Sequence, residues 1–210
     1  MLEAGQVLVQ AVGVLARHGL ALVAATVVWL ALSATVILFP PATLGLAIVA
    51  LSLAQGAVPR PRVVMQAVRR RLAASYVWAV VNGSAIALYV IRPYAGRVSS
   101  RVALALDLAV LIWFVLQLYA LPILLIQRGC RAPGAWRSAF LLALSAPVFT
   151  LIVAGVAALI LTWTLRLPIP LAAVGPGLLV LLGVLATRNR LADYGLTLDL
   201  PELAAAPERN

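Results

Sequence analysis

Residues 19–58 read GLALVAATVVWLALSATVILFPPATLGLAIVALSLAQGAV, two apolar runs that meet at a pair of prolines. The first run, Gly19–Phe39, reaches the length of about 20 mainly apolar residues that a membrane-spanning helix needs. Pro40 and Pro41 end this run, and the shorter run Ala42–Val58 follows them directly. The stretch therefore predicts two membrane helices joined by a tight corner at the prolines.

Four more apolar runs follow along the chain: Ala73–Ile91, Val102–Ile126, Ala139–Leu165 and Leu171–Thr187. The chain is 64% hydrophobic and 10% charged, whereas a soluble domain is about 45–50% apolar and about 25% charged. This composition excludes a water-soluble globular protein. The runs are too long for barrel strands, and a helix satisfies its own backbone polar groups in hydrocarbon. We therefore expect an all-α, polytopic transmembrane bundle of six helices, or five if Ala42–Val58 is re-entrant.

The arginines set the expected orientation, because all 16 basic residues are arginine and they lie between the apolar runs. With six crossings and the N-terminus inside, twelve arginines are cytoplasmic and four lie outside, as the positive-inside rule requires. If Ala42–Val58 does not cross, the best split is eleven to five with the N-terminus outside. Six crossings are preferred, which predicts a bacterial cytoplasmic membrane protein with both termini in the cytoplasm. Residues 1–190 then form one transmembrane domain, and residues 191–210 form a cytoplasmic tail.

The N-terminal stretch Leu2–Ala16 is apolar on several helical turns. Glu3 stands where a signal peptide carries its basic region, and the apolar run is longer than that of a signal peptide. We therefore expect this stretch to extend the first membrane helix.

The net charge of +10 does not indicate a nucleic-acid partner. Proteins that track phosphates carry a continuous basic face on a soluble module, and the sequence has no such module. In Arg62–Leu72, however, apolar residues fall on one side of a helix and polar residues on the other. We expect this helix to lie in the cytoplasmic interface with its apolar side in the bilayer. The arginines expected to contact anionic lipid headgroups are Arg62, Arg69, Arg70 and Arg71.

Polar side chains inside the apolar runs are the candidates for function, since they are costly in lipid and usually face protein or water. Asp107 is the single acid in any run, and Asn82 and Gln117 are the amides. Asp107 is interpreted either as a structural ion pair, which is favoured, or as part of a proton or cation relay. The arginines close to it in sequence are Arg92, Arg97 and Arg101.

Small residues indicate where helices approach one another closely. Ala79, Gly83 and Ala87 recur every four residues, a spacing that brings membrane helices together. Asn82 lies beside them and is expected to hydrogen-bond across the contact. A weaker pattern of the same kind surrounds Gly155.

Nothing in the sequence indicates catalysis. It contains no Ser-His-Asp set, no paired carboxylates and no HExxH motif. His18 is the single histidine and Cys130 the single cysteine, and neither has metal-ligand partners close by in the sequence. We therefore expect no enzyme activity, no metal site and no cofactor.

The stretch from Trp29 to Leu46 resembles the YesL-like family of uncharacterised bacterial integral membrane proteins. Members of that family carry a tryptophan in the first helix, a serine four residues later, and a Pro-Ala-Thr corner that opens the next helix. The matching residues here are Trp29, Ser33, Pro41, Ala42 and Thr43. A second similarity is an aromatic helix end with a proline, a polar loop and a following apolar helix. Its residues here are Tyr119, Pro122, Ala139, Phe140 and Pro147.

The sequence also departs from the family pattern. Thr26, Thr35 and Pro40 stand where the family has asparagine, proline and glycine, and residues 60–71 lack its Phe-Trp motif. The family is typically encoded beside carbohydrate ABC importers and glycan-degrading enzymes, and it has no established activity. The resemblance therefore carries over no catalytic residue.

The sequence leaves two functions open. The resemblance implies a non-enzymatic accessory or assembly partner of a carbohydrate ABC uptake system, in contact with importer permease subunits or with a second copy of itself. The alternative is a small oligomeric transporter or channel that uses the intramembrane acid Asp107, with Asn82 and Gln117 near its path.

Overall fold

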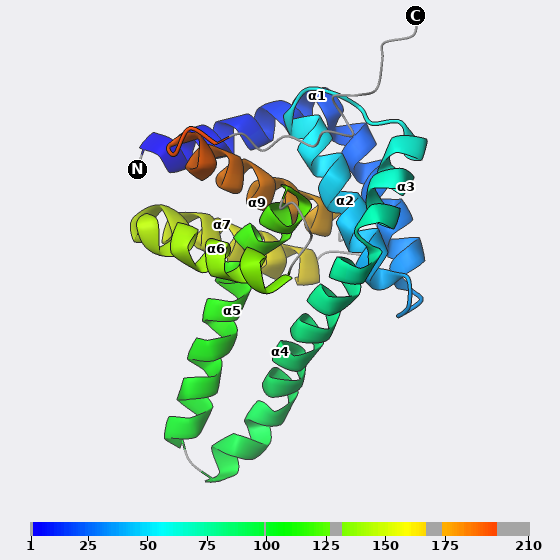
Figure 1. Ribbon diagram of the computed structural model, residues 1–210. Coiled ribbons are helices and arrows are strands. Elements are labelled where there is room, and N and C mark those ends of the chain that lie inside the picture. The colour runs from blue at the N-terminus through cyan, green and yellow to red at the C-terminus, as the bar shows by residue number, and fades with distance from the viewer. Residues whose placement is uncertain (1, 99, 127–131, 167–173, 197–210) are drawn as a thin grey trace, which may run out of the picture.

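The computed structural model describes residues 2–98, 100–126, 132–166 and 174–196, and every regular element in these ranges is a helix. The expectation of an all-α fold is confirmed. Figure 1 shows a body of short and long helices from which one helical hairpin extends. The helices are α1 Leu2–Ser33, α2 Phe39–Ala54, α3 Pro61–Arg70, α4 Leu72–Val98, α5 Ser100–Ile126, α6 Ala132–Ser145, α7 Pro147–Arg166 and α9 Val174–Ala192.

Four helical segments among the described residues are long and apolar enough to cross a membrane. They are Glu3–Ser33, Leu72–Ile91, Ser100–Ile126 and Pro147–Thr164. The apolar helix α2 has 16 residues, which gives about 24 Å of helix rise against a hydrocarbon core of about 30 Å. The predicted number of six spans is therefore not confirmed. Two helices that lie in predicted spans, α2 and α9, are not among these four segments.

The corner between the first two helices lies before the prolines, not at them. Helix α1 ends at Ser33, and α2 begins at Phe39 with Pro40 and Pro41 in its first turn. The prediction that the prolines end the first helix is wrong. The first turn of a helix has no internal acceptor for its N–H groups, so a proline there loses nothing.

The predicted single helix Ala139–Leu165 is two helices in the structure. Helix α6 ends at Ser145, and α7 begins at Pro147. Pro147 has no N–H to donate, and its ring disfavours helical backbone in the preceding residue. Pro122, by contrast, lies inside the continuous helix α5.

The N-terminal stretch extends the first helix as expected. Helix α1 begins at Leu2, and its backbone leaves helical geometry at His18 (φ −128°, ψ 18°). The half before this kink lies beside the end of α9, where Arg190 binds Glu3. Both chain ends of the helical body are therefore close together in Figure 1.

The expected amphipathic helix is α3, and part of its apolar side is buried against the protein. Ala67 and Val68 are buried, and the helix packs against α2. Val68 Cγ2 lies 3.6 Å from the position of a Cβ added to Gly45 of α2. Protein therefore covers part of the side that was expected to face the bilayer, and the position of α3 in the membrane interface stays a prediction.

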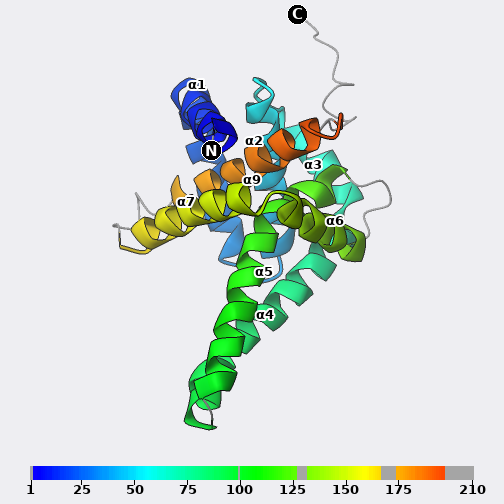
Figure 2. The same ribbon diagram turned by 90° about the vertical axis from the view of Figure 1, so that its left-hand side faces the viewer.

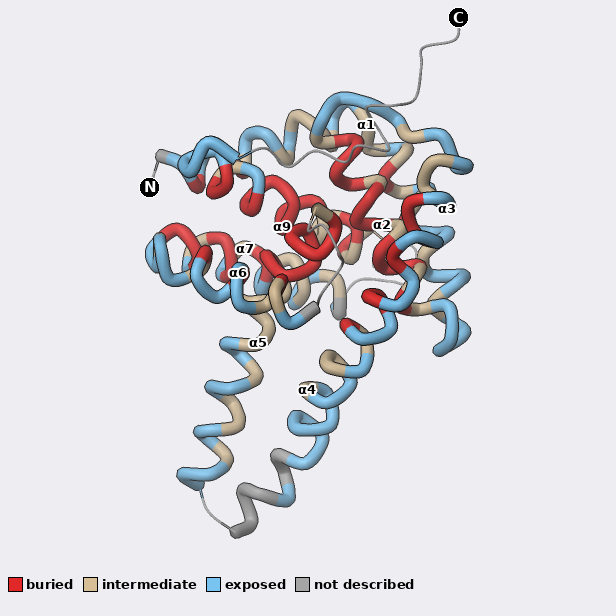
Figure 3. Tube along the Cα trace, in the orientation of Figure 1, coloured by how far each residue is buried: buried red, intermediate tan, exposed pale blue. Residues whose placement is uncertain are grey.

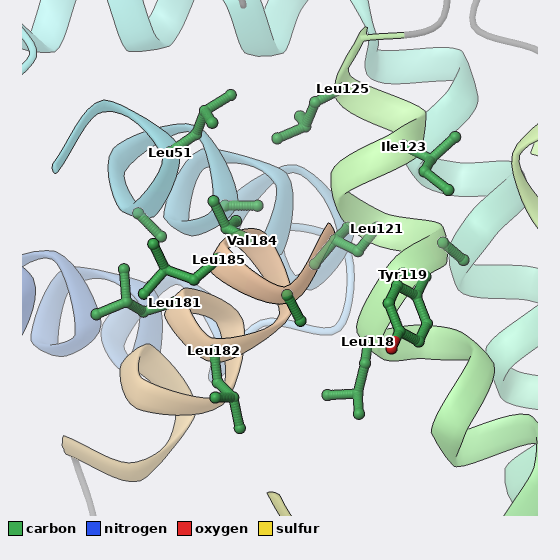
Figure 4. Packing of buried hydrophobic residues seen from close by; sticks show 14 of the residues in the cluster. Leu51, Leu118, Tyr119, Leu121, Ile123, Leu125, Leu181, Leu182, Val184 and Leu185 are labelled. Carbon is green, nitrogen blue, oxygen red and sulfur yellow. The ribbon is translucent and has the colours of Figure 1, made fainter. Parts of the chain in front are cut away.

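Helix α9 is the centre of the body. It contacts α1, α2, α5 and α7, and the tube in Figure 3 is buried along most of α9 and α2. In Figure 4, Val184 of α9 lies between Leu51 of α2 and Leu121 of α5, and Leu185 lies beside it. These four side chains are at most 7% exposed. The best-covered helices are therefore α2 and α9, which are not among the four segments long and apolar enough to cross a membrane.

Three glycines bring α9 close to its neighbours. A Cβ at Gly175 would collide with Thr164 of α7, and one at Gly177 would collide with Thr26 of α1. At Gly183 the added Cβ would lie 2.6 Å from the backbone oxygen of Leu118 in α5. That oxygen lacks its usual helical donor, since the residue four positions later is Pro122. The missing side chain of Gly183 thus lets α9 cover a carbonyl that the proline leaves free.

The α4–α5 hairpin extends away from this body in both views (Figures 1 and 2). Its outer part is apolar and uncovered by the rest of the chain. Exposed examples are Val80, Ile86, Leu104, Leu111 and Ile112. Near the body the same hairpin is buried, from Leu118 to Leu125 on α5. The hairpin is therefore anchored at one end.

Replacing Gly183 with alanine tests the close approach of α9 to α5. The added methyl meets a backbone atom that cannot rotate away, so Gly183→Ala is expected to lower the free energy of unfolding by about 1–3 kcal/mol. The matched control is Gly155→Ala on α7, where an added Cβ meets nothing within 4 Å. Unfolding in mixed micelles, followed by circular dichroism, gives both values. Equal stability of the two variants contradicts this packing.

Candidate functional site

The amide of Asn82 joins the two helices of the hairpin. Its Nδ2 donates to the backbone oxygen of Trp78 at 2.8 Å, and its Oδ1 accepts from Nε1 of Trp113 at 3.2 Å. Trp113 itself packs against the ring of Trp136 with centroids 5.6 Å apart. Asn82 therefore holds α4 to α5 through an indole N–H.

Gln117 makes a second contact of the same kind. Its Oε1 accepts from Nε1 of Trp78 at 2.9 Å. Its Nε2 is buried and has no hydrogen-bond partner among the described residues. An amide group that is half satisfied in an apolar environment is costly, so this nitrogen is a distinctive feature of the site.

The start of α2 supplies a third indole contact. Trp29 of α1 donates from Nε1 to Oγ1 of Thr43 at 3.0 Å, and Thr43 donates to the backbone oxygen of Phe39 at 2.9 Å. The Phe39 ring lies between Trp29 and Trp78, at centroid distances of 6.1 and 6.5 Å. Of the predicted corner residues Pro40, Pro41, Ala42 and Thr43, only Thr43 takes part in this arrangement.

Three of these residues help to line a partly open cavity of about 170 Å³ between α2, α4, α5 and α9. Thr43, Trp78 and Gln117 form its polar part. Apolar groups form the remainder: Phe114, Leu118, Leu121, Pro122, Leu179, Val180 and Gly183. The cavity lies where the anchored end of the hairpin meets the core, so it is framed by four helices that the α9 packing holds in place.

Asp107 lies apart from this site. It is half-buried on α5, ten residues before Gln117 in the same helix, which is about 15 Å along the axis. Arg101 is exposed on the same helix. The side chains of Arg92 and Arg97, the other proposed partners of Asp107, lie outside the described residues. The structure therefore brings Asn82 and Gln117 together with tryptophans, and it does not bring Asp107 to them.

The predicted lipid-contacting arginines divide into two groups. Arg62, Arg69 and Arg70 are exposed on α3. Arg71 is only 8% exposed, and it donates from Nε to the backbone oxygen of Leu125 and from Nη1 to that of Ala67. The assignment of Arg71 to lipid headgroups is wrong, because its guanidinium is buried and binds one carbonyl at the end of α5 and one on α3.

A buried arginine near the chain ends was missed by the sequence analysis. Arg190 is 8% exposed and binds Glu3 at 3.0 Å and Asp193 at 2.7 Å. Its guanidinium carbon also lies 5.4 Å from the ring centre of Phe149. The three-residue spacing between Arg190, in the last turn of α9, and Asp193, directly after this helix, was a local signal for this pair. Nothing in the sequence links either residue to Glu3.

Comparison with protein-family models, with curated proteins and with solved structures finds no match for this chain. The resemblance to the YesL-like family therefore stays a prediction.

A double-mutant cycle tests the bond between Trp113 and Asn82. The variants are Asn82→Leu, Trp113→Phe and their combination, and the expected coupling is about 0.6 kcal/mol and at most about 1.7 kcal/mol, as for other hydrogen bonds between membrane helices. The measurement is unfolding in mixed micelles. Trp163→Phe, at an exposed indole of α7, is the control and shows no coupling to Asn82→Leu. A Trp113 coupling no larger than this control contradicts the bond.

Proposed function

We propose that the protein is a non-enzymatic integral membrane protein that acts as an accessory or assembly partner of a membrane transport complex. The observation that carries this proposal is the use of the intramembrane amides. Asn82 and the Oε1 atom of Gln117 are bound to indole N–H groups, so they stabilise helix contacts and do not offer a chain of free polar atoms to a passing solute.

The surface of the hairpin supports the same conclusion. The outer parts of α4 and α5 expose apolar side chains on several sides. Such surfaces are suited to hydrocarbon and to the helices of another membrane protein. The uncovered apolar surface of the α4–α5 hairpin is therefore better suited to binding a partner helix than the interior of the protein is to conducting a solute.

The identity of the partner rests on the YesL-like resemblance alone. That resemblance points to the permease subunits of a carbohydrate ABC importer, and its residues are Trp29, Ser33 and the corner that follows. The Trp29–Thr43 hydrogen bond and the place of Pro41 in the first turn of α2 give these residues a structural role, in keeping with an accessory protein.

The proposed orientation places both termini in the cytoplasm. The Arg190–Glu3 ion pair brings the start of α1 and the end of α9 to the same side, and the exposed arginines of α3 satisfy the positive-inside rule when that side is cytoplasmic. The junction of α4 and α5 then lies outside the cell.

Cysteine labelling in intact cells tests this orientation. In a Cys130→Ala background, Ser100→Cys at the hairpin junction is expected to react with a membrane-impermeant maleimide. Tyr194→Cys, just after α9, is expected to react only after permeabilisation. Labelling of Tyr194→Cys in intact cells would contradict the proposed orientation.

Purification of the tagged protein from native membranes in mild detergent tests the accessory role. We expect a transporter permease to co-purify in a fixed ratio, as identified by mass spectrometry. Asp107→Asn is expected to keep both this association and full complementation of a deletion strain. Isolation of the protein alone, together with a folded Asp107→Asn variant that has lost solute flux, would instead establish the transporter alternative.

A further inference from the structure

Helix α1 consists of two halves that meet at His18. The backbone of this residue is not helical (φ −128°, ψ 18°), and in Figures 1 and 2 the helix changes direction between its halves. The ladder of backbone hydrogen bonds that stiffens a helix is interrupted at such a kink. His18 is therefore the place where one half of α1 can turn relative to the other.

The second half of α1 is fixed by close contacts. Leu22 and Thr26 are at most 1% exposed, and both lie against Gly177 of α9, where an added Cβ would collide with Thr26. Farther along, Trp29 donates a hydrogen bond to Thr43 of α2. Residues 19–33 are therefore held to two neighbouring helices.

The first half is held less firmly. Among residues 3–17 the buried side chains are those of Ala4 and Val7, whereas Val9 and Val12 are 72% and 66% exposed. Apolar packing in a membrane gains little over contact with lipid tails, because the tails are equally apolar. The position of this half thus depends largely on the ion pair that joins Glu3 to Arg190 of α9.

That ion pair can open without leaving a buried charge alone. Asp193 binds Arg190 at 2.7 Å, and Glu3 binds it at 3.0 Å. If Glu3 moves away, Asp193 still neutralises the guanidinium, so the large cost of an unpaired buried charge does not arise. The side chain of Glu3 is 55% exposed, so its carboxylate is already partly hydrated and returns to water at little cost.

We propose that residues 2–17 form a hinged strap, which turns about His18 and is latched to the end of α9 by the Glu3–Arg190 ion pair. In the closed position Glu3 lies against Arg190, whose guanidinium also lies over the ring of Phe149. Opening makes this guanidinium accessible from the side of α1, so the strap controls access to a buried positive charge. The inference does not depend on the proposed accessory function.

Distance measurements across the kink test the hinge. In a Cys130→Ala background, spin labels at Val9→Cys and Val28→Cys occupy exposed positions on either side of His18. Double electron–electron resonance of the full-length protein in nanodiscs is expected to show a dominant distance, for the closed strap, and a minor second distance, for the open strap. The control pair Leu20→Cys/Val28→Cys lies wholly within the second half and is expected to give a single distance.

Two carboxylate variants test the latch. Glu3→Gln keeps the size of the side chain and removes its charge, so the ratio of open to closed strap is expected to rise about fivefold, the effect of an ion pair with one exposed partner. The matched control is Asp193→Asn, which removes the other carboxylate from the same guanidinium. Glu3 is then the remaining counter-charge of Arg190 among the described residues, so this variant is expected not to raise the ratio.

Hydrogen–deuterium exchange gives a second readout that needs no variant. An isolated helix as short as the strap is marginally stable in water. Residues 8–16 are therefore expected to exchange at least about tenfold faster than residues 22–30 of the second half.

Three results would each overturn the proposal. The first is a single distance across the kink that is the same with and without the Glu3 carboxylate. The second is an equal rise of the open-to-closed ratio in Glu3→Gln and Asp193→Asn, and the third is equal exchange of the two halves of α1.

Discussion

At Gly183 the backbone of α9 lies directly against the Leu118 carbonyl of α5, and the arrangement of the other helices depends on this close approach. Pro122 removes the N–H that would bind this carbonyl within α5. The Gly183 backbone lies against this carbonyl at a distance that leaves no room for a Cβ, so glycine is the residue that fits there. Gly175 and Gly177 leave room for the side chains of Thr164 in α7 and Thr26 in α1.

The position of α9 explains why the polar side chains are where they are. With α9 and α2 fixed beside the anchored end of the hairpin, Trp78 and Gln117 face α2 and α9 across a cavity, whereas Asn82 and Trp113 meet farther along the hairpin. Indole groups suit this environment because each combines a large apolar surface with a single N–H that needs a partner. The single N–H of the Trp78 indole binds the oxygen of the Gln117 amide, and the nitrogen of this amide stays buried without a partner among the described residues.

The features that follow from local sequence were predictable. Length and hydropathy of each run decide whether a helix can cross a membrane, so α1, α4 and α5 were foreseen as long apolar helices, whereas α7 was foreseen only as part of a longer helix. Pro122 and Pro147 show the limit of local reasoning. The two prolines have the same chemistry, yet α5 continues where its turn is buried from Leu118 to Leu125, and the other helix breaks.

The close contacts were not predictable from spacing alone. The pattern around Gly83 and Gly155 indicated close helix packing, but a Cβ at either position meets nothing within 4 Å. The glycines at which an added Cβ would collide with a neighbouring helix lie on α9 and do not share a four-residue repeat. Arg190 likewise reads as a solvent-exposed basic residue until the fold brings Glu3 to it. Contacts between residues this far apart depend on the whole packing arrangement, which a single sequence does not encode as a local pattern.

Hydrogen–deuterium exchange of the protein in nanodiscs tests the central place of α9 most directly. Amides in a buried central helix open only with the whole fold, whereas those of a surface helix open locally. The account predicts that residues 178–187 exchange far more slowly than residues 62–70 of α3, and that Gly183→Ala removes much of this difference. Exchange of residues 178–187 at the rate of α3 would contradict it.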